Sequence, residues 1–139
     1  MKYQYHGIST SFRPLICLCG STRFEDFFHY VAQELTFAGC IVLMPNVFHH
    51  AKKIQLTGED KTTLVVVHRH KIAIADVILV INPCGYVGDS TKAEISVAHS
   101  LFKSVFFLFA EPQISIPPDR PSVPEKRIRA RLAEILYET

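Results

Sequence analysis

The sequence carries little net charge. Fifteen lysines and arginines stand against thirteen aspartates and glutamates, which gives a formal net charge of +2. A protein that binds duplex nucleic acid presents an extended basic surface to the phosphates, and this composition does not supply one. We therefore expect no duplex nucleic acid partner, whereas a small anionic ligand remains compatible with the composition.

Long hydrophobic runs are also missing. The most apolar stretch, residues 72–81, is interrupted by Asp76, and a bilayer-spanning helix needs about 18 to 20 apolar residues. Residues 1–13 are polar, and the short apolar run after them lacks a small-residue cleavage site. We expect a protein with no membrane partner and no secretory signal, located in the cytoplasm.

Familiar motifs for metal, redox and acyl-transfer chemistry are absent. The four cysteines form no CxxC pair, and the seven histidines match no ligand spacing such as His-Glu-x-x-His. Cys17 and Cys19 fall on one face of an expected strand, which indicates core packing. No nucleophile elbow is present. We expect reduced, buried thiols, no metal and no cofactor.

Apolar residues are abundant. They make up 48% of the 139 residues, against 20% charged residues. A folded chain of this length buries roughly 68% of the surface that its unfolded form exposes. We therefore expect one domain over residues 1–139, with a core at about 14–110.

Short apolar runs alternate with segments of helical periodicity. The runs predict strands at 14–19, 40–44, 77–81 and 105–109, and the periodic segments predict helices at 24–38 and 93–102. Residues 64–75 suit either a strand or a helix. A helix is favoured because a parallel sheet needs a crossover before the strand at 77–81.

The remaining segments are polar or rich in proline. Residues 46–61 predict a long loop, and five of the eight prolines lie at 112–124, which predicts an extended arm. Apolar residues at helical spacing predict an amphipathic C-terminal helix over 125–138. The pattern as a whole predicts an α/β fold, a flavodoxin-like doubly wound parallel sheet of strand order 2-1-3-4 with a C-terminal helix.

In that order, ligands bind beyond the carboxyl ends of the first and third strands, where loops 20–23 and 83–91 should meet. The first loop contains Gly20, Ser21, Thr22 and Arg23 ahead of a helix, a combination that binds anions through free N–H groups and a guanidinium. The alternative is a capping box between Thr22 and Glu25, which needs no ligand.

The second loop contains further candidates for ligand contact, namely Tyr86, Gly88, Asp89 and Ser90. Glu94 follows one helical turn later, where a carboxylate could face the crevice as a nucleophile or as a stabiliser of positive charge. A second capping box, Thr91-x-x-Glu94, is the alternative.

Three motifs resemble the nucleoside 2-deoxyribosyltransferase-like family, which includes the nucleoside 5'-monophosphate N-glycosidases. They are residues 18–24 (Leu-Cys-Gly-Ser-Thr-Arg-Phe), 71–76 (Lys-Ile-Ala-Ile-Ala-Asp) and 82–95 (Asn-Pro-x-Gly-Tyr-x-Gly-x-Ser-Thr-x-x-Glu-Ile). The resemblance covers about residues 15–109. The order and spacing of the three motifs together are more specific than any one motif.

The resemblance implies cleavage or transfer at the N-glycosidic bond of a nucleoside or nucleotide. Glu94 matches the family's glutamate at the anomeric carbon; Gly20, Ser21 and Arg23 match the loop near the sugar and 5'-phosphate, and Ser90 the second loop. His68 and Gly88 depart from the family, which has an aspartate at the first position and an aspartate or serine at the second. His68, Tyr86 and Asp89 are unranked candidates for protonating the departing base.

The same loops would also suit a nucleotide-binding module without turnover, or a protein-interaction domain in which both loops only start helices. The resemblance further implies a homodimer or higher homo-oligomer. We expect its interface around the third and fourth helices, near the aromatic-rich residues 101–109, with the arm reaching toward the partner's site.

Overall fold

The computed structural model describes residues 13–113, 115–118 and 120–139. Four parallel strands form one sheet in the order β2-β1-β3-β4. They are β1 (Leu15–Gly20), β2 (Ile41–Leu43), β3 (Val77–Ile81) and β4 (Ser104–Phe107). The predicted α/β flavodoxin-like fold and its strand order are confirmed.

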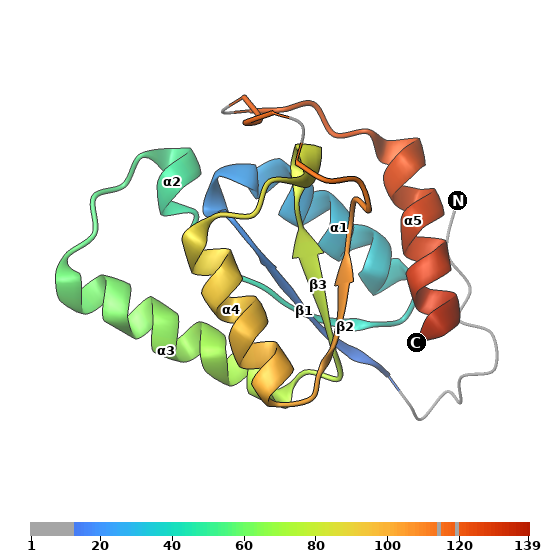
Figure 1. Cartoon of the computed structure of the whole chain (residues 1–139), viewed down its shortest axis with the longest axis horizontal. Coiled ribbons are helices and arrows are strands. Elements are labelled where there is room, and N and C mark those ends of the chain that lie inside the picture. Colours follow the sequence, from blue (N-terminus) through green and yellow to red (C-terminus); the bar gives the residue numbers. More distant parts are fainter. Residues whose placement is uncertain (1–12, 114, 119) are drawn as a thin grey trace.

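Two pairs of helices cover the two faces of the sheet (Figure 1). The first pair is α1 (Glu25–Phe37) and α5 (Glu125–Glu138), and the second is α3 (Gly58–Ile74) and α4 (Asp89–Ser100). Ile16 and Leu18 of β1 face the first pair, whereas Cys17 and Cys19 face the second. This alternation is the consequence of the two-residue period of a strand. Within the described ranges, no helix is long and apolar enough to cross a membrane.

The core beneath α1 and α5 contains most of the large apolar side chains. Phe24, Phe27 and Phe28 pack there, together with the apolar stripe of α5. All four members of that stripe, Ile128, Leu132, Ile135 and Leu136, are buried. The predicted C-terminal helix is therefore confirmed, and it completes this core.

The segment 46–61 differs from its prediction as one long loop. It contains α2 (His49–Lys52) and the first residues of α3. Thr57 and Asp60 form a capping box, in which the Asp60 N–H donates to Thr57 Oγ1 at 3.0 Å and the Thr57 N–H to Asp60 Oδ2 at 3.3 Å. The first turns of α3 are exposed and polar, so no apolar period marked them.

The end of β4 also differs, because the strand stops at Phe107 rather than at residue 109. Asn82 bonds the chain there in place of a strand partner. Its Nδ2 donates to Phe109 O and its Oδ1 accepts from the Phe109 N–H, both at 2.9 Å. The buried amide thus directs the chain after β4 across the carboxyl end of β3, toward the predicted ligand edge (Figure 1).

Candidate functional site

The two loops predicted to meet do so at the carboxyl edge of the sheet. The one-turn 3-10 helix η1 (Thr22–Phe24) follows β1, and η2 (Pro83–Gly85) follows β3. The Arg23 guanidinium lies 5.1 Å from the centroid of the Tyr86 ring. The Phe24 ring meets the same tyrosine edge-on at 6.0 Å. A cation–π contact and an aromatic pair therefore hold the loops together.

Gly20 allows the strands beneath these loops to approach closely. It has φ +152°, and a Cβ at this position would lie 2.7 Å from Ile81 O. Ser21 then caps η1, with its Oγ accepting a hydrogen bond of 3.4 Å from the Arg23 N–H. The first loop thus places a hydroxyl and a guanidinium at the carboxyl edge of the sheet.

Thr22 does not form the predicted capping box with Glu25. Its Oγ1 lies 2.8 Å from His50 Nδ1, whereas Glu25 pairs with His29 at 3.0 Å and with Lys52 at 3.5 Å. The reason is that α1 begins at Glu25 itself, after the separate turn of η1. This result excludes the Thr22–Glu25 capping box, and the Thr22 hydroxyl instead bonds to His50.

His50 is a site residue that the sequence interpretation missed. It lies on α2, which packs against η1. Burial lowers its pKa, and the charges of His49, Arg23 and Lys61 act in the same direction. The positive charges of Arg23 and Lys61 beside the first loop favour an anionic ligand. No spacing in the sequence signals His50, because α2 lies far from the loop along the chain.

The second capping box is also absent. Helix α4 begins at Asp89, with Gly88 as an N-cap that makes no side-chain bond, so Thr91 and Glu94 lie inside the helix. Asp89 and Ser90 are exposed at the helix start, whereas Thr91 is buried. A Cβ at Gly88 would lie 3.2 Å from the Tyr86 hydroxyl, so a larger residue would crowd it. Because Glu94 lies inside α4 and does not cap it, its carboxylate can face the neighbouring helix α3.

Glu94 contacts His68 across the α3–α4 interface. Glu94 Oε2 lies 3.1 Å from His68 Nε2, and the two side chains are 20% and 11% exposed. His68 Nε2 also lies 3.4 Å from Cys19 Sγ at the end of β1. The three residues were assigned separately from sequence, as a catalytic glutamate, a substrate contact and a core thiol. The structure brings them into one cluster beside the loops.

The surroundings shift the pKa values of both Glu94 and His68. Burial raises the pKa of Glu94 to about 7, although the charge of Arg69 opposes the shift. Burial lowers the pKa of His68 to about 4, and the charge of Lys71 adds to that effect. Near pH 7 the imidazole is therefore neutral and the carboxyl is near the middle of its titration. When the pair holds one proton, that proton therefore lies on the Glu94 carboxyl, which has the higher pKa.

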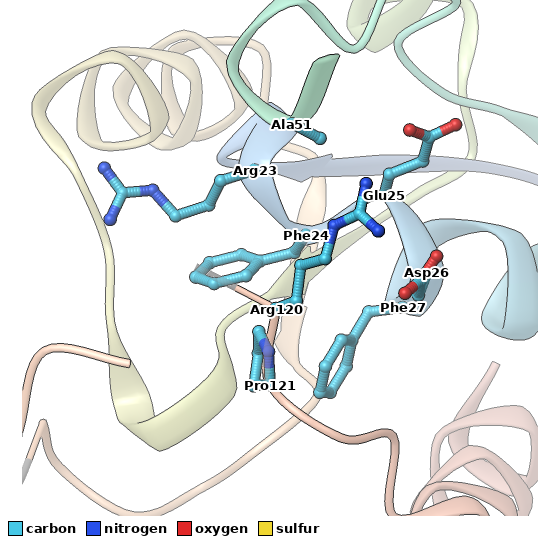
Figure 2. Close-up of a pocket in the computed structure, with 8 residues that line it drawn as sticks. All are labelled: Arg23, Phe24, Glu25, Asp26, Phe27, Ala51, Arg120 and Pro121. Carbon is cyan, nitrogen blue, oxygen red and sulfur yellow. The ribbon is translucent and has the colours of Figure 1, made fainter. Parts of the chain in front are cut away.

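The Pro-rich arm lies against its own chain. A Cβ on Gly85 would come within 2.6 Å of the backbone of Pro112 and Gln113. Arg120 and Pro121 line a cavity of about 10 Å³ with the start of α1, which is room for one water molecule. Figure 2 shows the Arg23 guanidinium directed away from that cavity. An anion held by Arg23 would therefore lie outside the cavity.

A larger cavity, of about 300 Å³, lies at the sheet edge. Its lining includes Thr36 on α1, Val42 on β2 and Lys71 on α3. Lys71 Nζ donates to Met44 O at 2.8 Å there. The lining contains neither Glu94 nor the residues of loops 20–23 and 83–91, so this space is separate from the candidate site.

A scan of the chain against protein-family models finds no match, and a search among curated proteins finds none either.

Proposed function

We propose that this protein cleaves or transfers the N-glycosidic bond of a nucleoside or nucleoside 5'-monophosphate. The observation that carries the proposal is the 3.1 Å contact between Glu94 and His68, one helical turn past the ligand edge. The resemblance of three motifs to the nucleoside 2-deoxyribosyltransferase-like family gives independent support. An acid–base pair beside an anion-binding loop is the combination that this reaction needs.

Glu94 would act at C1' of the sugar. Breaking the C1'–N bond sends its electron pair to the base and leaves positive charge on the ring. A carboxylate beneath C1' stabilises that charge more in the transition state than in the ground state. If Glu94 attacks, a C1'–O bond forms, and a water or second nucleoside base then displaces the carboxylate. The acceptor that reaches the site decides between hydrolysis and transfer.

His68 is the favoured proton donor among the three candidates. Tyr86 is engaged with Arg23 and Phe24, and Asp89 is exposed at the start of α4. His68 lies within hydrogen-bond distance of the carboxyl that must lose its proton. Because the pKa of Glu94 lies above that of His68 in the free protein, His68 would relay the Glu94 proton to the departing base in the same step in which the C1'–N bond breaks.

The 5'-phosphate would bind to the first loop. Ser21 caps η1 and Arg23 is its second residue. The charges of Arg23 and Lys61 lie near His50 on α2. A guanidinium can bind two phosphate oxygens through parallel hydrogen bonds. The proposal therefore favours a nucleoside 5'-monophosphate over the bare nucleoside.

This preference gives the first test, with Arg23→Ala. Hydrogen bonds to a charged group contribute about 1.5 to 3 kcal/mol, so the intact protein should bind the monophosphate roughly ten-fold tighter or more. Arg23→Ala should remove most of the difference, whereas Lys126→Ala, which removes an exposed positive charge on α5, should not. Calorimetry with both ligands measures it. Equal affinities in the intact protein would contradict the phosphate site.

A screen for free base tests the activity itself. The protein is incubated with a panel of deoxyribo- and ribonucleosides and their 5'-monophosphates, and the products are separated by chromatography. Release or exchange of a base supports the proposal. Tight binding by calorimetry without any release would instead favour a nucleotide-binding module.

A homodimer is the proposed assembly. Large apolar side chains are exposed on α3 and after α4, including Val66 at 51%, Ile74 at 62% and Phe102 at 97%. Four residues of the arm, which was expected to reach a partner, lie against their own chain: Pro112, Gln113, Arg120 and Pro121. The exposed helix surface therefore supports this proposal. A self-complementary patch is the commonest way in which one chain pairs with a second copy.

The variant Phe102→Asn tests the proposed dimer. Phe102 has φ +56°, a conformation that asparagine tolerates, so the change should preserve the fold. It should lower the dimer affinity, because a large apolar contact is lost. The control is Tyr137→Asn, an equally exposed aromatic on α5. Light scattering at micromolar concentration measures the mass, and one 15.7 kDa chain in the intact protein would contradict the dimer.

A further inference from the structure

Two thiols and an imidazole converge beneath helices α3 and α4. Cys17 Sγ, Cys19 Sγ and His68 Nε2 all lie within 4.8 Å of one another, and all three residues are buried. The Glu94 carboxylate lies 3.1 Å from the same imidazole nitrogen. Three atoms that can ligate a metal therefore lie together from β1 and α3, with the Glu94 carboxylate of α4 beside the imidazole.

We propose that this cluster is a binding site for Zn²⁺, with Cys17, Cys19 and His68 as its protein ligands. The inference concerns metal binding and does not depend on the proposed glycosidic activity.

The distances fit a tetrahedral ion. With Zn–S near 2.3 Å and Zn–N near 2.0 to 2.1 Å, ligands around one ion lie about 3.6 Å apart for sulfur and nitrogen. The observed separation between Cys19 Sγ and His68 Nε2 is 3.4 Å. Three protein ligands leave the fourth position of a tetrahedral ion for water. The Cys17 sulfur lies within 4.8 Å of both the Cys19 sulfur and a ring nitrogen of His68.

The donor types select the ion. Thiolate and imidazole suit Zn²⁺, whereas Mg²⁺ and Ca²⁺ require oxygen ligands. On binding, each thiol loses its proton to solvent, and the two thiolates neutralise the charge of the ion in the apolar surroundings of Ile72, Ile78 and Ala98. The sequence concealed this set because its members come from two elements with no motif spacing.

Occupation would compete with the proposed reaction. A Zn²⁺ ion bound by His68 would take the imidazole that pairs with Glu94 in the glycosidic step. Zinc should therefore inhibit any base release, and a chelator should restore it. If no activity is found, the metal site remains testable by spectroscopy.

Titration with Co²⁺ alone is the experiment. The intact protein should bind one ion per chain, with the strong visible bands of a tetrahedral site and thiolate-to-cobalt charge transfer, and Zn²⁺ should displace the signal. Cys17→Ser and Cys19→Ser should each remove one of the two thiolate contributions, or about half of the charge-transfer intensity. Cys84→Ser and Cys40→Ser are the matched controls, because Cys84 lies on η2 and Cys40 in the opposite core.

Three results would overturn the inference. They are a weak octahedral spectrum without charge transfer, an unchanged spectrum in a folded Cys17→Ser/Cys19→Ser double variant, and loss of the signal in Cys84→Ser. If the serine variants fail to fold, ¹¹³Cd NMR of the intact protein decides, because its shift reports the number of sulfur ligands. A resonance typical of two thiolates supports the site, and one typical of oxygen and nitrogen ligands contradicts it.

Discussion

Glu94→Gln is expected to abolish base release from a protein that still folds and still binds nucleotide. The amide keeps the shape of the carboxyl and can still hydrogen-bond to His68, but it carries no negative charge toward C1'. Loss of one group that stabilises transition-state charge typically costs about 100- to 1,000-fold in rate. Loss of the attacking oxygen itself costs at least as much. Initial rates with the best substrate of the screen measure the effect.

The controls separate chemistry from stability. Glu138→Gln, at the exposed end of α5, should leave the rate unchanged. Thermal unfolding and nucleotide affinity should be close to those of the intact protein in both variants. If Glu94 acted only through helix stability, the change would cost unfolding free energy while turnover per folded molecule stayed normal. Normal turnover in a folded Glu94→Gln protein would remove this residue from the mechanism.

His68→Asn carries the second large effect. Removal of a general acid usually lowers a rate by about 100- to 10,000-fold. Asparagine still donates and accepts hydrogen bonds beside Glu94 but exchanges no proton near neutral pH. The loss should be large for purine and pyrimidine substrates, whose departing base needs a proton. It should be much smaller for a synthetic sugar whose leaving group departs as a stable anion.

This dependence on the leaving group identifies the role of His68. A residue that only positions Glu94 would slow both kinds of substrate to the same extent. The control is His70→Asn, because His70 is exposed on the same helix. Equal losses with both leaving groups would make His68 a positioning residue, and no loss would exclude it from the reaction.

Much of the fold could be predicted because each strand is a short apolar run that ends in a turn signal. Gly20 and Pro83 mark the ends of β1 and β3, and the stripe of α5 repeats at helical spacing. Helix α2 and the start of α3 escaped prediction because their residues are mostly polar and exposed. Apolar residues therefore showed neither the helical period nor the two-residue period of a strand. The strand order followed from the flavodoxin-like pattern of alternating strands and helices. The crossover needed before β3 predicted the helix α3.

The site was predicted in part. Glu94 and the loop 20–23 follow from motif positions, and the structure places them at adjoining parts of one sheet edge. The two capping boxes were local alternatives that matched the sequence pattern of a helix start. They are wrong because the helices begin three residues after Thr22 and two before Thr91. The contacts of His50 and Cys19 depend on tertiary packing between elements that are distant along the chain. The spacing of residues in the sequence cannot predict such contacts.

The most direct test of the central claim follows the anomeric proton of a nucleoside 5'-monophosphate by NMR, because its resonance reports on the C1'–N bond itself. With the intact protein, the signal should move from the nucleotide to a free or newly transferred sugar. With Glu94→Gln at the same concentration, it should remain in place. An unchanged signal across the panel, with binding demonstrated in the same samples, would contradict the account, as would equal conversion by both proteins.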